Sequence, residues 1–561
     1  MEPGPRDLLV MYALQNAVRH RSVPKGGTVL GTLMGNHPEY RSRAKEMAAL
    51  LADVLEEVER MTPEEREGRL TALAPGLMVP KMQKRERESE LPDLEEAEHG
   101  VVMRFAPNPS GPLHIGHARA AYLNDFYVRK YGGRYVLRIE DTDPRRIERE
   151  NYDLLQSDIE WLDLAVTETV YQSDRMDIYH EHGRRLIELG GAYVCTCEAE
   201  RFRTLKLEKK ACPCRSAGIE ESLALWDRML AGAFAEGTVT VRVRTDLSHP
   251  DPAMRDFSIF RIVDAPPHPR CDTRVYPLMN FSVVIDDHLL GITHVIRGKD
   301  HIANTRRQEY IYTYFGWKPP YYRHYGRMSI EGLVLSTSAI KEGIREGLYA
   351  GWDDIHLGTL KAIARRGILP KAVRNAMIDI GIGDTDISFS WENLYAKNKA
   401  LIDPVANRYF FIPHPERHLI GNAPDQTAHA LLHPNHPERG SRDLMFSGEV
   451  FISTDDITGH KMVRLKDLFN VRISQDEGIL RLSYAGDSLD EARAAKAPIV
   501  QWLPAGEAQS CVLKKPNGNV DGLCEPAAAL EIGRVVQFER VGFARIDAVE
   551  DGIVQAYYAH R

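Results

Sequence analysis

Hydrophobic residues recur every three to four positions through roughly the first 85 residues, which is the spacing of amphipathic helices. The first such run contains Leu8, Leu9, Met11, Tyr12, Leu14 and Val18. A second run starts near Pro38-Glu39 and contains Met47, Leu50, Leu51, Val54, Leu55 and Val58. The segment from Lys84 to His99 is dense in charge and contains Pro92, which indicates a solvated linker. Residues 1–98 are therefore predicted to form a helical domain with its linker.

The pattern changes at Gly100. Val101 to Ala106 is a short apolar run, a Pro/Gly turn follows, and a helix is predicted from His114 to about Tyr131. After two glycines, Tyr135 to Ile139 forms a second strand pattern that ends in acidic residues. Strand, helix and strand in this order predict an α/β fold with a parallel, Rossmann-type sheet whose strand ends bind a nucleotide.

The rest of the chain divides by pattern. A cysteine cluster and strand-like alternation interrupt the sheet, helical spacing follows it, and short β-branched segments separated by Gly, Asp, Asn and Pro suggest β-barrels. The predicted boundaries are 99–194 and 291–340 for the two halves of the Rossmann-type catalytic domain, 195–290 for an insertion, 341–400 for a helical domain and 401–561 for β-barrels.

Composition adds limits on compartment and partners. The chain has 561 residues, enough for three or four domains, and its 43% hydrophobic and 27% charged residues are ordinary for a globular protein. It has no run of roughly 20 apolar residues and no secretory pattern at its start, so a cytoplasmic protein is expected. The formal charge of −8 argues against a general nucleic-acid coat but leaves room for a local basic face that binds nucleic acid.

The stretch Arg104-Phe-Ala-Pro-Asn-Pro-Ser-Gly-Pro-Leu-His-Ile-Gly-His117 carries the strongest chemical signal. It predicts a strand, a rigid turn and a helix start, where backbone N–H groups favour phosphate. His114 and His117 are three residues apart, so both imidazoles can face one side of the first turn and stabilise charge on an ATP α-phosphate. Gly116 lets a flat base approach the backbone. A bare H-x-G-H also fits histidines that only cap or pack the helix.

The full stretch resembles the HIGH signature of class I aminoacyl-tRNA synthetases in the wording of the glutamyl/glutaminyl group. Leu137-Arg-Ile-Glu-Asp-Thr-Asp-Pro144 and Asp286-Asp-His-Leu-Leu-Gly-Ile-Thr-His-Val-Ile-Arg-Gly-Lys-Asp300 are similar to two further blocks of that group. Asn16-Ala17 and Asn36-His-Pro-Glu39 in the helical start, together with the β-rich end, look like the archaeal glutamyl enzymes. The resemblance thus covers nearly the whole chain.

The resemblance implies a set of substrate-binding residues. A glutamate pocket must neutralise a side-chain carboxylate, which suits arginine, and must hold an α-ammonium group, which suits a carboxylate. By resemblance, Arg104 meets the substrate side chain and Glu140 lies near the ammonium group. Asn108 is assigned to glutamate and also to ATP, in a set with Pro107, Pro109, Ser110, Gly111 and Gly116.

Arg297 separates the two branches of the group. Glutamyl enzymes carry arginine here, whereas the glutaminyl branch usually has a small uncharged residue. The other interpretation is a strand-end arginine that pairs with Asp286 or Asp300. Position 279 departs from the family, because it is Met where a pocket tyrosine is common. Either Tyr276 replaces that tyrosine or the pocket is built differently.

A second phosphate loop is degenerate. Class I synthetases usually carry a KMSKS-like loop whose lysine stabilises the leaving pyrophosphate, and the candidate here is Val334-Leu-Ser-Thr-Ser-Ala-Ile-Lys341. Ser336 and Ser338 match the family as ATP-binding residues, but Thr337 occupies the lysine position. The missing charge comes either from Lys341, a candidate catalytic residue, or from Mg²⁺ bound with ATP. Arg327 fits the preceding ATP-binding loop.

Four of the seven cysteines form two C-x-C pairs separated by fourteen residues, which predicts one structural Zn²⁺. The four expected ligands are Cys195, Cys197, Cys212 and Cys214. Free or redox-active thiols are the other interpretation. By resemblance, the inserted domain that holds this cluster contacts the tRNA acceptor stem. Three further cysteines are isolated and are expected to pack in cores: Cys271, Cys511 and Cys524.

The expected function is therefore ATP-dependent activation of glutamate and its transfer to tRNA-Glu, with tRNA-Gln as a further acceptor of the archaeal enzymes. Family resemblance also implies that tRNA is needed for the first step, that residues 341–400 contact its stem and that the β-barrels read its anticodon. Three alternatives remain: a glutaminyl-tRNA synthetase, a small-molecule adenylyltransferase and a noncatalytic tRNA-binding paralogue. Asn108-Pro-Ser and Arg297 argue against the first, the long β region against the second and the intact histidines against the third. Oligomeric state cannot be read from the sequence.

Overall fold

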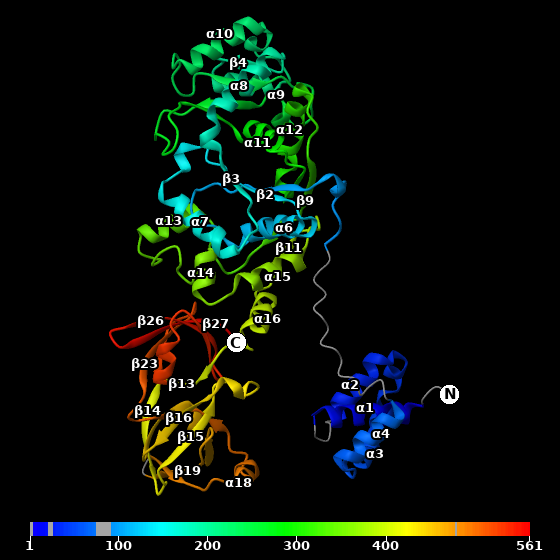
Figure 1. Cartoon of the computed structure of the whole chain (residues 1–561), viewed down its shortest axis with the longest axis vertical. Coiled ribbons are helices and arrows are strands. Elements are labelled where there is room, and N and C mark those ends of the chain that lie inside the picture. The colour runs from blue at the N-terminus through cyan, green and yellow to red at the C-terminus, as the bar shows by residue number, and fades with distance from the viewer. Residues whose placement is uncertain (1–3, 21–25, 75–90, 477–478) are drawn as a thin grey trace. The chain divides into compact units, whose positions relative to one another are not determined.

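The computed structural model describes residues 4–20, 26–74, 91–476 and 479–561 (Figure 1). The chain divides into two compact units, Met1–Glu90 and Leu91–Arg561. In the first unit, the helices are α1 (Pro5–His20), α2 (Gly26–Asn36), η1 (Pro38–Arg43), α3 (Ala44–Glu59) and α4 (Pro63–Leu73). Their apolar faces share one core, in which Leu9, Leu33 and Val54 are fully buried. The predicted helical start is confirmed, and the predicted linker lies outside the described residues as far as residue 90.

A parallel sheet forms the centre of the region that follows the helical unit. Strand β2 (Arg134–Ile139) lies between β1 (Val102–Phe105) and β3 (Glu168–Tyr171), and β8 (His294–Gly298) pairs in parallel with β9 (Tyr321–Tyr325). The Thr293 amide donates to the Val102 carbonyl at 2.9 Å, which places β8 beside β1. The strand order β3-β2-β1-β8-β9 is that of a Rossmann-type sheet and confirms the predicted fold class.

Helices cover this sheet. They include α6 (Ile115–Tyr131), which packs on β1, as well as α7 (Glu150–Leu162) and α12 (Ile302–Phe315). Apolar residues of β1, β2 and α6 are almost wholly buried in one core because parallel strands are covered on both faces. The packing of sheet and helices therefore fixes the positions of the strand ends, and a cavity lies at these ends.

The predicted insertion forms its own layer. An antiparallel sheet runs in the order β4 (Ala192–Cys195), β5 (Thr240–Val243), β6 (Ser258–Ile262) and β7 (Val275–Pro277). Helices α8 (Met176–Glu188), α9 (Ala199–Leu207), α10 (Ile219–Leu230) and α11 (Met279–Leu289) accompany it. In the core of this layer, the rings of Trp226 and Phe260 pack edge to face with their centroids 4.9 Å apart. The chain returns to the parallel sheet through α11, which brings Asp286 and Asp287 beside Arg138 of β2.

Helices and then β-sheets complete the second unit. The helices are α13 (Thr337–Arg345), α14 (Leu360–Arg365), α15 (Pro370–Ile380) and α16 (Trp391–Ile402), and β10 (Met328–Ser329) pairs with β11 (Ile387–Ser388). Within the described residues, two seven-stranded sheets follow, with the orders β12-β25-β26-β27-β23-β24-β13 and β21-β18-β19-β20-β14-β17-β22. Each has a separate apolar core, around Phe538 and Trp502 respectively, so the predicted barrel-like β region is confirmed.

The bounds of these strands follow the short β-branched segments of the sequence. They are β12 (Arg408–Tyr409), β13 (Phe411–Pro413), β14 (Pro415–Gly421), β17 (Glu449–Ser453), β18 (Met462–Leu465), β19 (Asn470–Asp476), β20 (Ile479–Tyr484), β21 (Ile499–Val500), β22 (Leu503–Pro504), β23 (Gln509–Lys514), β24 (Val520–Cys524), β25 (Val535–Phe538), β26 (Gly542–Glu550) and β27 (Ile553–His560). A separate hairpin joins β15 (Gln426–Leu431) to β16 (Ser441–Phe446).

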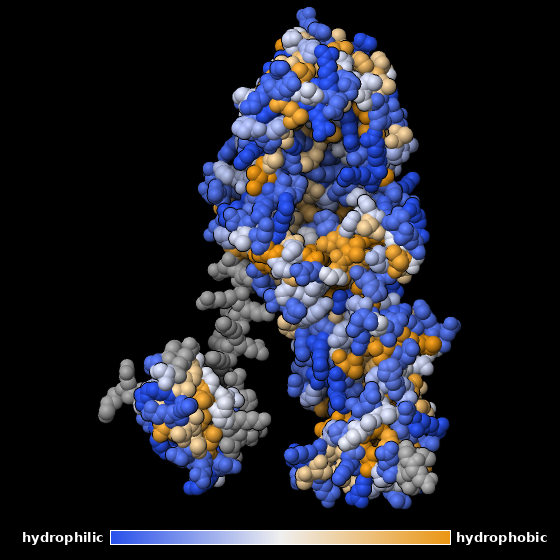
Figure 2. Space-filling model, turned by 180° about the vertical axis from the view of Figure 1, so that it is seen from behind, coloured by the Kyte–Doolittle hydropathy of each residue, from blue (hydrophilic) through white to orange (hydrophobic). Residues whose placement is uncertain are grey.

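The face of the molecule seen in Figure 2 is mostly hydrophilic, and hydrophobic residues gather across the middle of the second unit. Among the described helices, none combines the length and the apolar character that a bilayer crossing requires.

Candidate active site

The start of α6 fixes the two histidines of the phosphate motif. His114 is the N-cap, and its Nδ1 accepts the Gly116 amide N–H at 3.1 Å, while Nδ1 of His117 accepts the His114 amide N–H at 3.2 Å. The rings stack with centroids 3.8 Å apart. A neutral imidazole that accepts at Nδ1 carries its proton on Nε2. Capping therefore uses one nitrogen of each ring and leaves each Nε2–H to act as a donor.

Burial keeps both rings neutral. It lowers the pKa of His114 to about 4, and burial followed by the proximity of His114 lowers the pKa of His117 to about 3. At neutral pH the site thus offers two uncharged N–H donors whose orientation is set before substrate binds. Gly116 protects this geometry, because a Cβ there would lie 2.9 Å from Cε1 of His114.

A buried carboxylate secures the turn before these histidines. Oδ2 of Asp158, on α7, accepts the Leu113 amide N–H at 2.6 Å. Burial raises the pKa of Asp158 to about 6, although this hydrogen bond and nearby Lys361 act in the opposite direction. Lys361 lies 3.7 Å from Oδ1 of Asp158. The phosphate motif is therefore tied to α7 and α14 as well as to its own helix.

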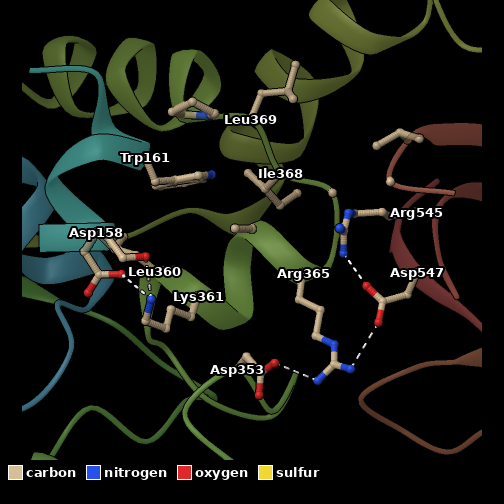
Figure 3. Close-up of a pocket in the computed structure, with 16 residues that line it drawn as sticks. Asp158, Trp161, Asp353, Leu360, Lys361, Arg365, Ile368, Leu369, Arg545 and Asp547 are labelled. Atoms are coloured by element: carbon tan, nitrogen blue, oxygen red, sulfur yellow. Dashed lines mark hydrogen bonds and ion pairs between the residues drawn. The ribbon is translucent and has the colours of Figure 1, made fainter. Parts of the chain in front are cut away.

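Lys361 also borders a cavity of about 570 Å³ between α7, α14 and β26 (Figure 3). Across this cavity, Arg365 joins Asp353 at 2.8 Å to Asp547 at 3.1 Å, and Arg545 pairs with the same Asp547. The charged side chains around this cavity are thus largely paired with one another, and these pairs link α14 to the C-terminal β region.

The main candidate site is a cavity of about 680 Å³ at the ends of β1, β2 and β8. Eight of the predicted residues line it, and so does Met279, the position that departs from the family: Arg104, Pro107, Asn108, Gly116, His117, Glu140, Arg297 and Arg327. Pro109, Ser110, Gly111, His114, Ser336, Ser338 and Lys341 are not among the residues that line it. The cavity therefore brings the predicted glutamate-binding residues beside one of the two histidines.

Buried charges organise the amino-acid end of this cavity. Arg138 is fully buried and donates to Asp287 at 2.5 Å and to Glu140 at 2.9 Å. Nε of Arg104 lies 3.5 Å from the same Asp287 oxygen. Burial alone would raise the pKa of Asp287, but Arg138 and Arg104 hold it below its usual range. Arg138 thus orients Glu140, and Asp287 anchors Arg104.

Arg297 is bound differently. Its Nη2 donates to Oγ1 of Thr305 at 2.7 Å and to Oε1 of Gln308 at 2.9 Å, and its guanidinium lies 4.9 Å from the ring centroid of Tyr322. In the described part of the chain, no ion pair joins it to Asp286, to Asp300 or to another carboxylate. Burial and then Arg104 lower the pKa of Arg297 to about 10, so it stays charged at neutral pH.

Met279 stands where the family commonly has a pocket tyrosine, and its surroundings show how the pocket is built without that tyrosine. Met279 lines the cavity, and its sulfur accepts a hydrogen bond from Gln308 Nε2 at 3.9 Å. Tyr276 is buried on β7 and does not line the cavity, so it is not the replacement that the sequence left open. Tyr325 is the tyrosine that lines it, and it comes from β9. The pocket is thus built differently from the family pattern.

The second phosphate loop meets the first without reaching the cavity. Ser336 caps α13 by accepting the Ala339 amide N–H at 3.4 Å. A Cβ on Gly111 would lie 2.7 Å from Cγ2 of Thr337, so the two loops are in close contact. Lys341 Nζ instead pairs with Glu148 at 2.5 Å on a partly exposed surface.

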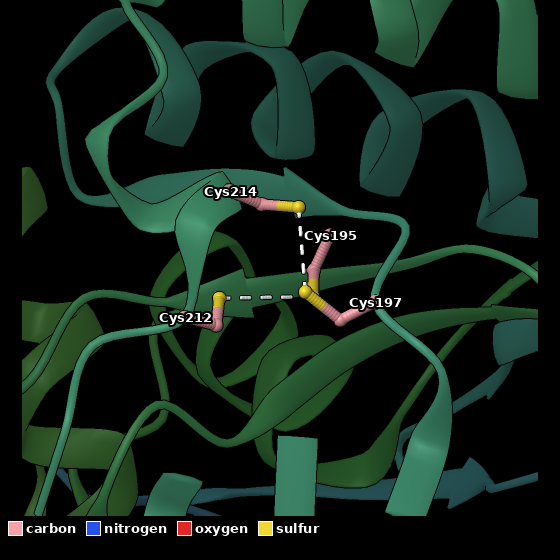
Figure 4. A group of neighbouring side chains, drawn as sticks. All are labelled: Cys195, Cys197, Cys212 and Cys214. Atoms are coloured by element: carbon pink, nitrogen blue, oxygen red, sulfur yellow. Dashed lines mark hydrogen bonds between the residues drawn. The ribbon is translucent and has the colours of Figure 1, made fainter. Parts of the chain in front are cut away.

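The four predicted cysteines lie together. Their Sγ atoms are all within 4.8 Å of one another, with 3.9 Å between Cys195 and Cys212 and 3.6 Å between Cys197 and Cys214 (Figure 4). Thiolates around a tetrahedral Zn²⁺ are about 3.8 Å apart, whereas a disulfide requires about 2.05 Å. All four are free thiols, so their arrangement fits one zinc ion better than disulfides.

Several residues of the site were not predicted from the sequence. Arg119 is fully buried, donates to the Gly326 and Gly381 carbonyls at 2.7 and 2.9 Å, and stacks on Tyr325. It thereby holds the loop that carries Arg327. Arg138, Asp287 and Gln308 were also missed as functional residues. Arg138 and Asp287 both lie inside sequence blocks that resemble the family. Their contacts with other residues of the site form only where strands and helices pack together.

Comparisons with known proteins agree on a family. The family described as "tRNA synthetases class I (E and Q), catalytic domain" matches residues 100–404. Two families described as anti-codon binding domains of the same synthetases match residues 406–484 and 499–547. The chain is 64% identical to the glutamate–tRNA ligase of Methanoculleus marisnigri over 100% of both chains. It is 59% identical to that of Methanocorpusculum labreanum over 99% of both.

Proposed function

The chain belongs to the class I tRNA synthetases of the glutamate and glutamine group, and we propose that it ligates glutamate to tRNA-Glu at the expense of ATP. The observation that carries the choice of glutamate is Arg297, a buried cation in the candidate cavity that has only neutral hydrogen-bond partners. A substrate side chain with a negative charge complements it, whereas a neutral amide does not.

The first step forms glutamyl-adenylate. An α-carboxylate oxygen of glutamate attacks the α-phosphorus of ATP, and the bond from that phosphorus to the oxygen that bridges the α- and β-phosphates breaks, so pyrophosphate leaves. Nε2–H of His117 and His114 would donate to the phosphate oxygens as charge develops on them. Pro107, Asn108, Pro109, Ser110 and Gly111, with the start of α6, would hold the nucleotide, and Mg²⁺ bound with ATP supplies further positive charge.

Glutamate is placed by the buried charges of the cavity. Arg104 and Arg297 would bind its side-chain carboxylate, and Asn108 would border it. Glu140, oriented by Arg138, would accept hydrogen bonds from the α-ammonium group. This arrangement leaves the α-carboxylate facing the phosphate site, which is the orientation that the first step requires.

The second step transfers glutamate to tRNA. A hydroxyl oxygen of the terminal adenosine attacks the carbonyl carbon of the adenylate, the bond from that carbon to the phosphate oxygen breaks, and AMP leaves together with the hydroxyl proton. We propose that residues 195–290 contact the acceptor stem, residues 341–400 the adjoining stem and residues 401–561 the anticodon. The tRNA partner is thus tRNA-Glu, and we propose tRNA-Gln as a further acceptor, which the charging assay tests. The cysteines, all of them free thiols, support a reducing compartment such as the cytoplasm.

The test is an aminoacylation assay. Purified protein, Mg·ATP and radiolabelled glutamate or glutamine are incubated with tRNA-Glu and tRNA-Gln transcripts in separate reactions. Glutamate attached to tRNA-Glu alone identifies a discriminating enzyme, and glutamate attached to both identifies a nondiscriminating one. Glutamine attached to tRNA-Gln would overturn the assignment of Arg297. Bound but uncharged tRNA would identify a noncatalytic paralogue.

Lys341 is proposed to assist pyrophosphate departure. Its pair with Glu148 is partly exposed, and exposed ion pairs contribute only about 0–1 kcal/mol, so the lysine can leave this partner at little cost. Lys341→Ala is expected to slow adenylate formation at least about tenfold in single-turnover experiments. Glu148→Gln breaks the same pair but keeps the lysine, and its rate is expected to stay within about twofold of wild type. An unchanged rate in Lys341→Ala would remove the lysine from the mechanism.

Zinc is proposed to hold the insertion in shape. Freshly purified protein is expected to contain about one zinc ion per chain, because four thiolates complete a closed tetrahedral site. Cys212→Ser is expected to lose the metal and lower the thermal unfolding midpoint. Cys271→Ser, at an isolated thiol, is expected to retain it. Metal analysis and calorimetry measure both effects without relying on activity, and metal-free wild-type protein with an unchanged midpoint would contradict the assignment.

A further inference from the structure

Gln308 is a neutral residue that contacts Arg297, one of the charged residues that line the cavity. It lies on α12, is fully buried and holds Arg297 through its side-chain oxygen at 2.9 Å. Its amide nitrogen donates to Asn280 at 3.4 Å and approaches the Met279 sulfur, so the orientation of the amide group is set by its surroundings. Gln308 is therefore an acceptor toward Arg297 and carries no charge.

The second anchor of Arg297 is neutral as well. Oγ1 of Thr305 accepts a hydrogen bond from Arg297 at 2.7 Å and forms another hydrogen bond with Nε2 of His324 at 2.9 Å. Burial lowers the pKa of His324 to about 4, so this ring is uncharged at neutral pH. Arg104 differs, since it shares Asp287 with Arg138. In the same region, one arginine has a carboxylate beside it and the other does not.

Arg297 also retains donors for a ligand. Its Nε is buried and has no hydrogen-bond partner among the described residues. A buried N–H that stays unpaired costs about 1–3 kcal/mol, and a carboxylate bound in the cavity could satisfy this one. Nε of Arg104 is unpaired as well, so what distinguishes Arg297 is that its hydrogen-bond partners are all neutral, which leaves its guanidinium without a direct carboxylate contact and suited to an incoming carboxylate.

We propose that Gln308 is a specificity-determining positioning residue: by holding Arg297 with a neutral amide, it reserves the guanidinium charge for the side-chain carboxylate of the substrate. This inference rests on the proposed function. Gln308 acts through Arg297 and is not among the residues that line the cavity. A carboxylate at the same position would form an internal ion pair with Arg297 and compete with glutamate for it.

The test changes the charge of residue 308 without changing its shape. Gln308→Glu is expected to raise KM for glutamate by about 10- to 100-fold, the scale of a charge-assisted hydrogen bond, and to leave KM for ATP within about twofold. The preference for glutamate over glutamine is expected to fall by a similar factor. Gln308→Met keeps the volume and leaves Arg297 unopposed, so its preference for glutamate is expected to persist.

Two further variants keep the result interpretable. Thr305→Asp places a carboxylate on the other anchor and is expected to raise KM for glutamate in the same way, which covers the case in which Gln308→Glu does not fold. Gln156→Glu makes the same chemical change at an exposed position of α7 and is expected to behave as wild type. Circular dichroism and the thermal midpoint confirm folding of each variant.

The outcomes separate the inference from the proposed function. Wild-type protein that fails to charge tRNA with glutamate overturns the proposed function itself. If wild type charges glutamate, but Gln308→Glu and Gln308→Met have the same KM for glutamate and the same preference, Gln308 only packs and the inference is wrong. Equal rises in KM for glutamate and ATP would likewise indicate a general structural role.

Discussion

Replacement of His117 by asparagine is expected to slow glutamyl-adenylate formation by about 100- to 1000-fold, the usual effect of removing one oriented donor from a transition state. Asparagine retains an oxygen near the place of Nδ1, so it can still accept the His114 amide N–H that caps α6. It lacks the Nε2–H that we propose donates to the α-phosphate. The substitution therefore removes the donor and spares the cap.

Single-turnover adenylate formation measures this effect. His117→Gln extends an N–H toward the place of Nε2 and is expected to recover part of the rate, while the thermal midpoint of His117→Asn stays close to wild type. Because burial lowers the pKa of His114 to about 4 and of His117 to about 3, wild-type rates should show no titration of these rings above about pH 5. A rate in His117→Asn that equals wild type would leave the histidine with a capping role only.

Replacement of Asp287 by alanine is expected to lower the free energy of unfolding by about 3–5 kcal/mol, the cost of removing one partner from a buried ion pair. Asp287 is fully buried and lies 2.5 Å from Arg138 and 3.5 Å from Arg104. Its loss leaves two buried guanidinium groups with less opposing charge. The glutamate site should suffer as well, because Arg104 loses its anchor.

The thermal unfolding midpoint and KM for glutamate measure the two consequences. Asp93 provides a matched control, since it pairs with Lys130 at 2.7 Å but is 79% exposed. Asp93→Ala is expected to shift the thermal midpoint far less than Asp287→Ala does and to leave KM unchanged, because exposed ion pairs contribute little to stability. Equal midpoint shifts in the two variants would show that the buried network around Asp287 contributes no more than a surface pair.

Local patterns in the sequence were sufficient for the elements that carry the site. The apolar run before Ala106, the turn and the helix from His114 appear as β1, a loop and α6, because strand, turn and N-cap preferences act within a few residues. The C-x-C pairs predicted a cluster for the same reason, since each pair is short and the insertion only has to bring two of them together. Cys195 does so from β4, and Cys212 from the position just before the short helix η5 (Pro213–Ser216).

Resemblance supplied the residues that line the cavity, but not their partners. Arg297 was left between pairing with a carboxylate and serving as a free cation, and Thr305 and Gln308 on α12 decide for the second. Tyr276 was left as a replacement for the missing pocket tyrosine, yet its position on β7 keeps it out of the cavity. Lys341 remains a prediction, because its ion pair with Glu148 does not test a catalytic role.

The sequence by itself determined the fold class, the two histidines on one helical turn, the four cysteines and the membership of Arg104, Glu140 and Arg297 in one kind of site. The first three properties depend on residue type and on spacing along the chain, whereas the membership of these three residues in one site was implied by resemblance to the family. The tertiary structure alone decided which nitrogen of each histidine is free, which arginine shares Asp287 and which is left uncompensated. Protonation and charge in a buried site depend on contacts between residues far apart in the chain, such as Arg138 and Asp287, which are 149 positions apart, and no local pattern encodes those contacts.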